Sequence, residues 1–164
     1  MSETTDAGGV AAAMTHAADA AEELTTAAAA FQALGMTRRL QVMQLFVHVS
    51  GTLCGCEIAD VLELEDYQVS RDLAALRKAG LVEARERVGT WIHYRCATDP
   101  GPTLTELLAL IGEIPLAPTT TARLERRLSF REQGGGVRGV GDPEVLAALD
   151  QAGHAQLPVW GQQR

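Results

Sequence analysis

The sequence is poor in cysteine, in aromatic residues and in long apolar runs. Only three of its 164 residues are cysteine, an odd number that argues against a disulfide framework and leaves free thiols in a reducing compartment. No apolar run is long enough to cross a bilayer, so we expect no membrane partner. The first 30 residues contain no Lys or Arg. A secretory signal needs such a basic region, so we expect a cytoplasmic protein.

The charge of the chain is divided unevenly along its length. The formal net charge is −7, yet residues 1–30 alone hold five acidic residues and no basic residue, or −5. Residues 68–95 hold six basic residues against three acidic ones, or +3. Contact with phosphate depends on local charge, so the acidic total does not exclude a nucleic-acid partner for the middle of the chain.

The composition divides the chain into three expected parts. Residues 1–30 form an acidic, Ala-rich leader, partly disordered or helical, with a helix expected over 11–34 because alanine favours helix. Residues 31–112 carry the periodic apolar pattern of one folded domain, and Thr37 is expected to cap a helix that reaches about His48. Residues 113–164 form a C-terminal extension with a linker and short helices.

The middle of the chain predicts a winged helix-turn-helix, mainly α with a small β-hairpin wing. A short helix over about 56–62 is followed by a turn and by a second helix over about 67–79, which Gly80 ends. Two alternating runs, Leu81–Arg87 and Trp91–Cys96, flank Gly89 and predict a hairpin whose tip carries Arg85 and Arg87.

The C-terminal part carries fewer signals. A helix is expected from Thr103 or Thr105 to about Gly112, and a second, basic helix over 121–132. Its arginines favour a solvated face over extra phosphate contacts; they are Arg123, Arg126, Arg127 and Arg131. Asp142 and Pro143 are typical of the N-cap and first position of a last short helix.

Residues 31–112 resemble the ArsR/SmtB family of metal- and metalloid-responsive repressors. The matching stretches are Ala33-Leu34, Thr37-Arg38, Leu53-Cys54-Gly55-Cys56-Glu57-Ile58-Ala59, Val69-Ser70-Arg71, Ala79-Gly80-Leu81-Val82 and Gly89-Thr90-Trp91-Ile92-His93-Tyr94-Arg95. The resemblance implies a homodimer that holds double-stranded operator DNA in its apo form and releases it when an ion binds. In the arsenic-sensing branch the Leu-Cys-x-Cys-acid motif supplies the thiolates, which here are Cys54 and Cys56.

The chain departs from other branches of that family. The leader contains no cysteine of the kind that the cadmium/lead branch uses, and residues 103–112 contain no histidine of the kind that the zinc branch uses. Ala59 stands where the arsenic branch often has a third cysteine, and Asp72 stands where a histidine is common.

The cysteine pair predicts a site for a soft ion. Thiolates favour soft ions, and two or three sulfurs suit As(III) or Sb(III) better than zinc, which requires four ligands in a closed site. A helix N-terminus favours the thiolate form. Residues two apart do not face each other on a regular helix, so we expect ion binding to distort the first turn and move the recognition helix. Two small, buried cysteines are the structural alternative.

The third cysteine has two interpretations. Cys96 shares a strand face with Ile92 and Tyr94, which favours a core thiol. Pairing of Thr52 and Leu53 with Ile92–Arg95 would instead bring Cys96 near Cys54 as a third ligand. The four histidines are scattered without metal-ligand spacing, so we interpret them as structural or solvated.

The recognition helix predicts the DNA contacts. Tyr67, Gln68, Ser70 and Arg71 lie in its N-terminal half, which enters the major groove, where Gln suits adenine and Arg suits guanine. Phosphate contacts are expected from four further basic residues, namely Arg77, Lys78, Arg85 and Arg87.

Two other functions remain as hypotheses. One keeps the repressor and makes the same cysteines a sensor of cadmium, lead, zinc or thiol oxidation. The other is a thiol oxidoreductase, which we disfavour because the chain shows no thioredoxin-like βαβ pattern. No Ser/His/Asp arrangement or phosphate loop is evident either, so we expect no enzyme and no organic cofactor.

Overall fold

The computed structural model describes residues 7–88, 91–132 and 142–154. The helices are α1 (Ala7–Leu34), α2 (Thr37–His48), α3 (Gly55–Leu62), α4 (Asp66–Lys78), α5 (Pro102–Glu113), α6 (Pro118–Glu132) and α7 (Pro143–His154). The strands are β1 (Leu53–Cys54), β2 (Val82–Val88) and β3 (Trp91–Cys96). Within these residues no helix combines the length and apolar character that a membrane span requires.

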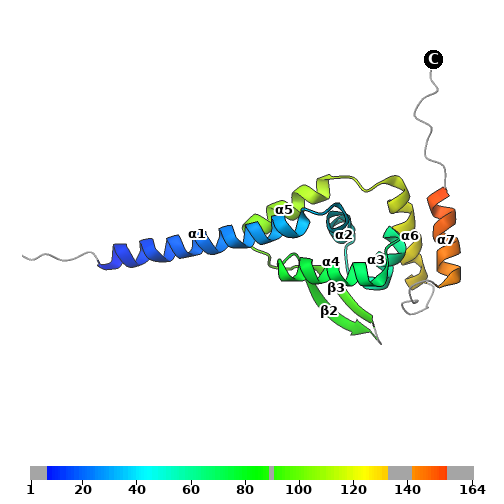
Figure 1. Ribbon diagram of the computed structural model, residues 1–164, viewed down its shortest axis with the longest axis horizontal. Coiled ribbons are helices and arrows are strands. Elements are labelled where there is room, and N and C mark those ends of the chain that lie inside the picture. The colour runs from blue at the N-terminus through cyan, green and yellow to red at the C-terminus, as the bar shows by residue number, and fades with distance from the viewer. Residues whose placement is uncertain (1–6, 89–90, 133–141, 155–164) are drawn as a thin grey trace, which may run out of the picture.

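Helices α2, α3 and α4 and the three strands form a winged helix-turn-helix, as the sequence predicts (Figure 1). The turn between α3 and α4 begins at Glu63, whose φ of 55° places it in the left-handed region. The end of α4 is followed by Gly80 with φ 73°, a conformation that favours glycine. The predicted bounds of α3 and α4 are confirmed to within one residue.

The sheet is antiparallel in the order β1-β3-β2. Strand β3 is central, so the expected pairing of the segment before α3 with the second wing strand is confirmed. In that pairing Leu53 lies opposite Tyr94 and Cys54 lies opposite His93. The β2–β3 hairpin is irregular between Ala84 and Glu86 and extends away from the helices (Figure 1).

One apolar core joins the helices of the winged helix to the sheet. Its fully buried side chains are Ala30, Val42, Leu45, Leu53, Ile58, Leu76 and Leu81, among others, contributed by α1, α2, β1, α3, α4 and the start of the wing. Burial of each Val, Leu or Ile side chain among them stabilises the fold by about 1.5–3 kcal/mol. The start of α3, which carries the cysteine motif, is therefore packed against this core.

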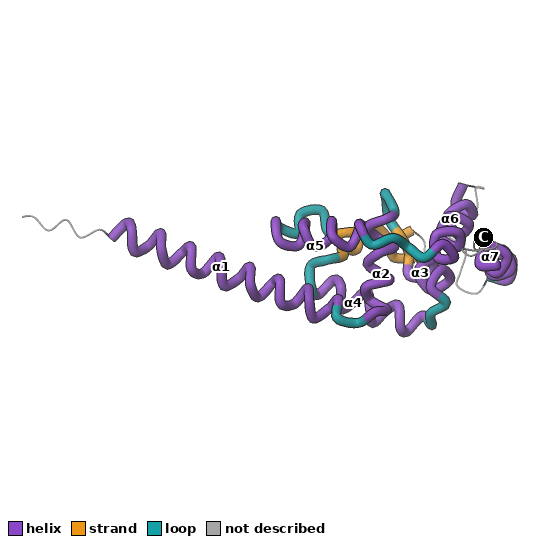
Figure 2. Tube along the Cα trace, turned by 90° about the horizontal axis from the view of Figure 1, so that it is seen from above, coloured by secondary structure: helices purple, strands orange, loops and turns teal. Residues whose placement is uncertain are grey.

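Helix α1 is continuous through residue 30, where the sequence suggested the end of a leader. Its C-terminal half packs beside α2, α4 and α5, whereas its N-terminal half projects alone from the body (Figures 1 and 2). The projecting half exposes Met14. The expected cap at Thr37 is wrong, because the N-cap of α2 is Met36 and Thr37 is the first helical residue.

Helices α6 and α7 lie at the opposite end of the molecule from the projecting part of α1 (Figure 1). They pack on each other through a second apolar cluster of Phe130, Val145, Ala148 and Leu149. The predicted cap of α7 is confirmed, because Asp142 Oδ1 accepts the backbone N–H of Glu144 at 3.0 Å. Helix α6 also packs on α3, and this contact connects the C-terminal extension to the cysteine motif.

Candidate functional site

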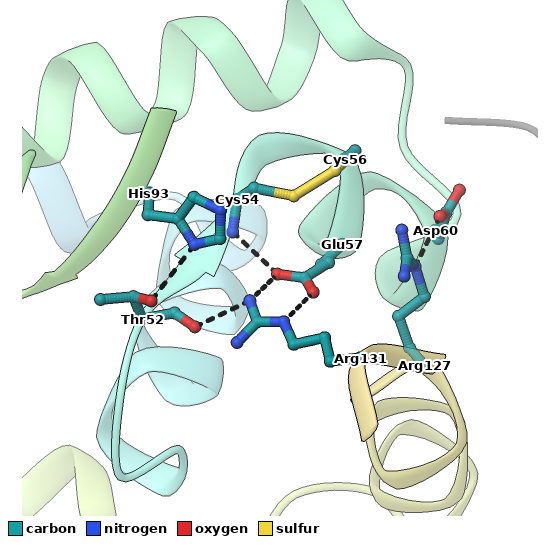
Figure 3. The surroundings of a disulfide bond; sticks show 8 residues. All are labelled: Thr52, Cys54, Cys56, Glu57, Asp60, His93, Arg127 and Arg131. Carbon is teal, nitrogen blue, oxygen red and sulfur yellow. Dashed lines mark hydrogen bonds and ion pairs between the residues drawn. A yellow bond between two sulfur atoms is a disulfide. The ribbon is translucent and has the colours of Figure 1, made fainter. Parts of the chain in front are cut away.

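Cys54 and Cys56 lie at the junction of β1 and α3, and a disulfide joins them (Figure 3). Cys54 is the N-cap residue of α3, with extended backbone (φ −88°, ψ 163°), and Cys56 is the second residue of the helix. Their Cα atoms are 5.4 Å apart, within the range that a disulfide spans. The expectation of free thiols is therefore wrong for Cys54 and Cys56 in this form of the protein and is confirmed for Cys96.

The extended cap also removes the need for a distorted helix. Residues i and i+2 diverge when both are helical, but Cys54 lies just outside the regular helix. The two sulfurs meet while α3 keeps its regular first turn. Both side chains are buried, yet Cys56 borders a surface hollow of about 220 Å³ that Ser70, Trp91 and Ile92 also line. This hollow brings the surface close to Cys56 on the side of α4 and β3.

Cys96 lies apart from the pair. The expectation that strand pairing would place Cys96 beside Cys54 is wrong, because the register sets His93 opposite Cys54. Cys96 lies three positions further along β3, on the other face of the strand and about 10 Å away along it. Burial raises the pKa of the Cys96 thiol from 9.0 to about 11, which leaves it protonated and unreactive near neutral pH.

His93 is the residue that the register brings to the cysteines (Figure 3). Its side chain is buried, and its Nδ1 lies 3.2 Å from Thr52 Oγ1. Its Nε2 is a buried atom without a hydrogen-bond partner in the described part of the chain. In that part no three His, Cys, Asp or Glu side chains are grouped as metal ligands. The structure thus assembles two sulfurs and one neighbouring imidazole.

Glu57 connects the cysteine motif to helix α6 of the C-terminal extension (Figure 3). Its side chain is 0% exposed, and its Oε2 accepts the backbone N–H of Cys54 at 2.9 Å. Arg131 of α6 binds both carboxylate oxygens of Glu57 and donates through Nη2 to the carbonyl of Thr52 at 3.0 Å. A charge-assisted, two-pronged contact of this kind is among the stronger polar interactions in proteins.

Two further arginines of α6 bind the other end of α3. Arg127 is 1% exposed, and its Nε donates to Asp60 Oδ2 at 2.9 Å. Arg123 donates to the backbone carbonyls of Val61 and Asp60 at 3.1 and 2.7 Å. The expectation of a solvated arginine face is therefore wrong for these two residues and for Arg131; of the four, Arg126 alone is exposed.

The predicted DNA-contacting side chains lie on α4 and on the wing. Tyr67, Ser70 and Arg71 are exposed on the N-terminal half of α4. The basic residues Arg77, Lys78, Arg85 and Arg87 are also exposed. The Arg77 guanidinium lies 6.0 Å from the ring centroid of Tyr94, so this arginine links α4 to β3. Apart from Tyr67 and Ser70, these exposed side chains all carry positive charge.

Two polar residues of α4 have internal partners. Gln68 Oε1 accepts the backbone N–H of Glu65 at 3.0 Å, so the amide caps α4 and is half-buried. Asp72 is buried and accepts hydrogen bonds from Arg38 Nε and Nη2 at 2.5 and 3.2 Å. These bonds raise the pKa of Arg38. Asp72 fixes α4 on α2 and does not contribute to the exposed face.

The site residues that the sequence interpretation missed are Glu57, Asp60, His93 and the three α6 arginines. A signal for Glu57 was present, because an acid three residues after an N-cap is the pattern of a capping box. Arg123, Arg127 and Arg131 recur every four residues, which places them on one helix face. Nothing in the sequence indicated that this face meets α3.

Comparisons with known proteins place the chain among regulators. Residues 37–84 match the family model described as "Bacterial regulatory protein, arsR family". An uncharacterized HTH-type transcriptional regulator of Methanocaldococcus jannaschii is 34% identical over 93 residues, which cover 57% of this chain and 99% of that protein.

Two of the relatives are named for arsenic. The arsenic resistance transcriptional regulator ArsR1 of Pseudomonas putida is 40% identical over 73 residues, covering 44% of this chain and 56% of that protein. The arsenical resistance operon repressor of Escherichia coli is 37% identical over 65 residues, covering 40% of this chain and 54% of that protein. The chain thus spans just over half the length of each of these two relatives.

Proposed function

This chain belongs to the arsR family of bacterial regulatory proteins, and we propose that it is a transcriptional repressor whose hold on operator DNA depends on the state of Cys54 and Cys56. Its proposed effectors are As(III) and Sb(III), which the reduced cysteines bind. The observation that carries the proposal is the meeting of both sulfurs at the start of α3, one element before the exposed recognition helix.

The donor set supports a metalloid effector. Sulfur ligands select soft ions, whereas zinc prefers four ligands in a tetrahedron. Two thiols replace two hydroxyl groups of arsenous acid, and two water molecules leave. The third position keeps its hydroxyl or takes another donor, for which His93 Nε2 is the candidate by register. The two relatives named for arsenic resistance support the same effector.

Helix α3 is the element through which ion binding at the cysteines would change the DNA-binding face. The two reduced thiols are not bonded to each other, so an ion that binds both fixes their separation and moves Cys54 relative to Cys56. Helix α3 packs directly on α4, so a shift of its first turn moves the face that carries Tyr67, Ser70 and Arg71. Small shifts of this size change DNA affinity when several phosphate and base contacts must form together.

The disulfide favours a second candidate function, the sensing of thiol oxidation. Two thiols lose two protons and two electrons when they join, and a peroxide that accepts them becomes two water molecules. The form with Cys54–Cys56 bonded is then the oxidised state of the switch. Both candidate functions use the same two sulfurs. They differ in whether the sulfurs react with a metalloid or with an oxidant.

We propose a homodimer as the DNA-binding species. The described part of α1 exposes Met14, Leu24 and Phe31, and α5 and its end expose Leu110 and Ile114. Exposed apolar side chains along two neighbouring helices are typical of an interface. A two-fold dimer predicts a nearly palindromic operator with half-sites about one helical turn apart.

The experiment is a fluorescence-anisotropy titration of the reduced protein on the DNA upstream of its own gene. We expect arsenite and antimonite at micromolar concentration to release the DNA, and zinc to leave it bound. Cadmium and peroxide are tested in separate runs to distinguish the second candidate. Tight binding that none of these reagents changes would remove the cysteine pair from the mechanism.

A further inference from the structure

A surface cavity of about 590 Å³ lies between the end of α2, the connection that follows α5, and one face of α6. It is more than twice as large as the hollow of about 220 Å³ beside Cys56. The connection runs past α2 to α6 (Figure 1), and Gln44 of α2 donates through Nε2 to the carbonyl of Ile114 at 3.2 Å. One wall of the cavity thus belongs to the helix-turn-helix region and the other to the C-terminal extension.

The apolar walls of the cavity are continuous with the main core. Leu124 of α6 is buried in that core, and Val49, Leu116 and Leu128 pack against it. Side chains held in this way are already in place before a ligand arrives. A cavity of this size with a mostly apolar lining is typical of sites for small organic molecules. The lining therefore predicts a ligand with an apolar body.

The polar groups that line the cavity can accept hydrogen bonds. His48 Nδ1 donates to the carbonyl of Gln44 at 2.9 Å, which leaves Nε2 of the neutral ring as an acceptor. Thr121 Oγ1 donates to the carbonyl of Ala117 at 3.3 Å, so its lone pairs remain for another donor. Glu125 is exposed, and its carboxylate forms no hydrogen bond or ion pair with another residue that the structure describes. These acceptors predict a ligand that donates hydrogen bonds.

The charge of the cavity narrows the ligand further. Among the described residues that line it there is no Lys or Arg, and Glu125 supplies its carboxylate. The neighbouring Arg126 places its guanidinium 5.4 Å from the ring centroid of Phe130. A hollow lined by charge of one sign beside an apolar wall concentrates ligands of the opposite sign. The cavity therefore favours a cation over a neutral molecule or an anion.

We propose that this cavity is a binding site for a small organic cation, whose apolar body lies against the leucines and whose protonated amine binds the Glu125 carboxylate. The remaining N–H groups of the amine bond to the acceptors of His48 and Thr121. The site is separate from the cysteine pair and goes beyond the proposed sensing role. Helix α6 also packs on α3, so the bound cation contacts the helix that holds the cysteine motif.

The test is isothermal titration calorimetry of the full-length protein, near neutral pH, with three probes that share one apolar body. Benzhydrylamine carries a cation, benzhydrol a neutral hydroxyl and diphenylacetate an anion on the same pair of rings. We expect the amine to bind saturably with one molecule per chain. The alcohol should bind about fivefold more weakly, which is the upper range for an exposed ion pair, and diphenylacetate should not bind measurably.

Three variants locate the probe. Glu125→Gln keeps the shape of the side chain and removes its charge, so it should lower the affinity for the amine to that for the alcohol. Glu106→Gln, at an exposed acid of α5 outside the cavity, is the matched control and should change no affinity. Ser50→Trp places a large ring at an exposed position of the lining and should abolish binding of both probes, with the fold checked by circular dichroism.

The inference is overturned if neither the amine nor the alcohol binds, if diphenylacetate binds as well as the amine, or if Glu125→Gln keeps the preference for the amine. Binding that persists in a folded Ser50→Trp variant also overturns it, because the probe then lies elsewhere. Neither Cys54 nor Cys56 lines the cavity, so the variant with serine at both positions should bind the amine as the wild type does. Failure of the proposed thiol switch is thereby distinguished from failure of this site.

Discussion

Arginines of the same helix differ sharply in their surroundings. Arg127 and Asp60 form an ion pair in which both side chains are almost completely buried. Arg126 precedes Arg127 by one residue and is exposed, with its guanidinium 5.4 Å from the ring of Phe130. A buried ion pair is sensitive to the loss of one partner, because the other charge then stays buried without its partner and without contact with water.

Replacement of Arg127 by Gln should therefore destabilise the protein strongly. We expect the free energy of unfolding to fall by about 3–5 kcal/mol, since Asp60 is left as a buried charge without this partner. Arg126→Gln, the control, should change it by about 0.5 kcal/mol or less. Urea denaturation followed by circular dichroism measures both, and equal losses would contradict the assigned packing of α6 on α3.

At the residue scale the sequence predicted the chemistry of the side chains better than their surroundings in the folded protein. The nature of Cys54 and Cys56 as a sulfur pair follows from their spacing, and their location at a helix start was confirmed. Their oxidation state and the burial of Arg127 depend on which segments meet in space. Arginine side chains are usually exposed, so a solvated arginine face on α6 was the reasonable expectation from the sequence. The packing of α6 on α3 is what buries it.

The recognition helix α4 is the element whose bounds and faces the sequence predicted most fully. Its inward residues Val69, Leu73 and Leu76 are buried, and Tyr67 and Arg71 are exposed. Asp72 and Arg38 join α4 to α2, so the exposed face is held in a fixed orientation. A fixed face is what base contacts in the major groove require.

Replacement of Arg71 by Ala should weaken operator binding without loss of fold. One base-contacting arginine contributes about 1–3 kcal/mol of discrimination, so we expect the affinity to fall by about 5- to 150-fold. Arg126→Ala, an exposed arginine on α6, should leave the affinity unchanged. Anisotropy titrations at one fixed salt concentration measure both, and an unchanged affinity for Arg71→Ala would remove it from the interface.

At the element scale the hairpin and α4 were predictable because their apolar periodicity is complete within each segment. The pairing of β1 with β3 was anticipated, but its register was not, since it is a contact across 39 or more residues. The docking of α6 on α3 could not be predicted. A basic amphipathic helix has the same sequence pattern whether its basic face contacts DNA, solvent or an acidic helix.

The described part of the molecule is elongated because the N-terminal half of α1 projects beyond the other helices (Figures 1 and 2). A single helix in water gains little from its own hydrogen bonds, so most helices in proteins depend on tertiary packing. Leu24 and Phe31 are 72% and 61% exposed in the single chain. We propose that a second copy of the chain covers these side chains.

Changing both Leu24 and Phe31 to Glu should weaken the dimer. We expect the wild-type protein to be dimeric at micromolar concentration and the double variant to dissociate, because charged side chains replace apolar ones at the proposed interface. Tyr67→Ala, equally exposed but on α4, should remain dimeric and should bind DNA less tightly. Sedimentation velocity distinguishes the two, and a monomeric wild type would contradict the proposal.

The measurement that tests the account most directly is operator release by arsenite from the reduced wild type and from the Cys54→Ser, Cys56→Ser double variant. Both proteins should bind the DNA upstream of the gene with similar affinity, because serine preserves the size of the buried positions. Micromolar arsenite should release the wild type alone. If the double variant is released at the same arsenite concentration, the state of the Cys54–Cys56 pair does not control DNA binding.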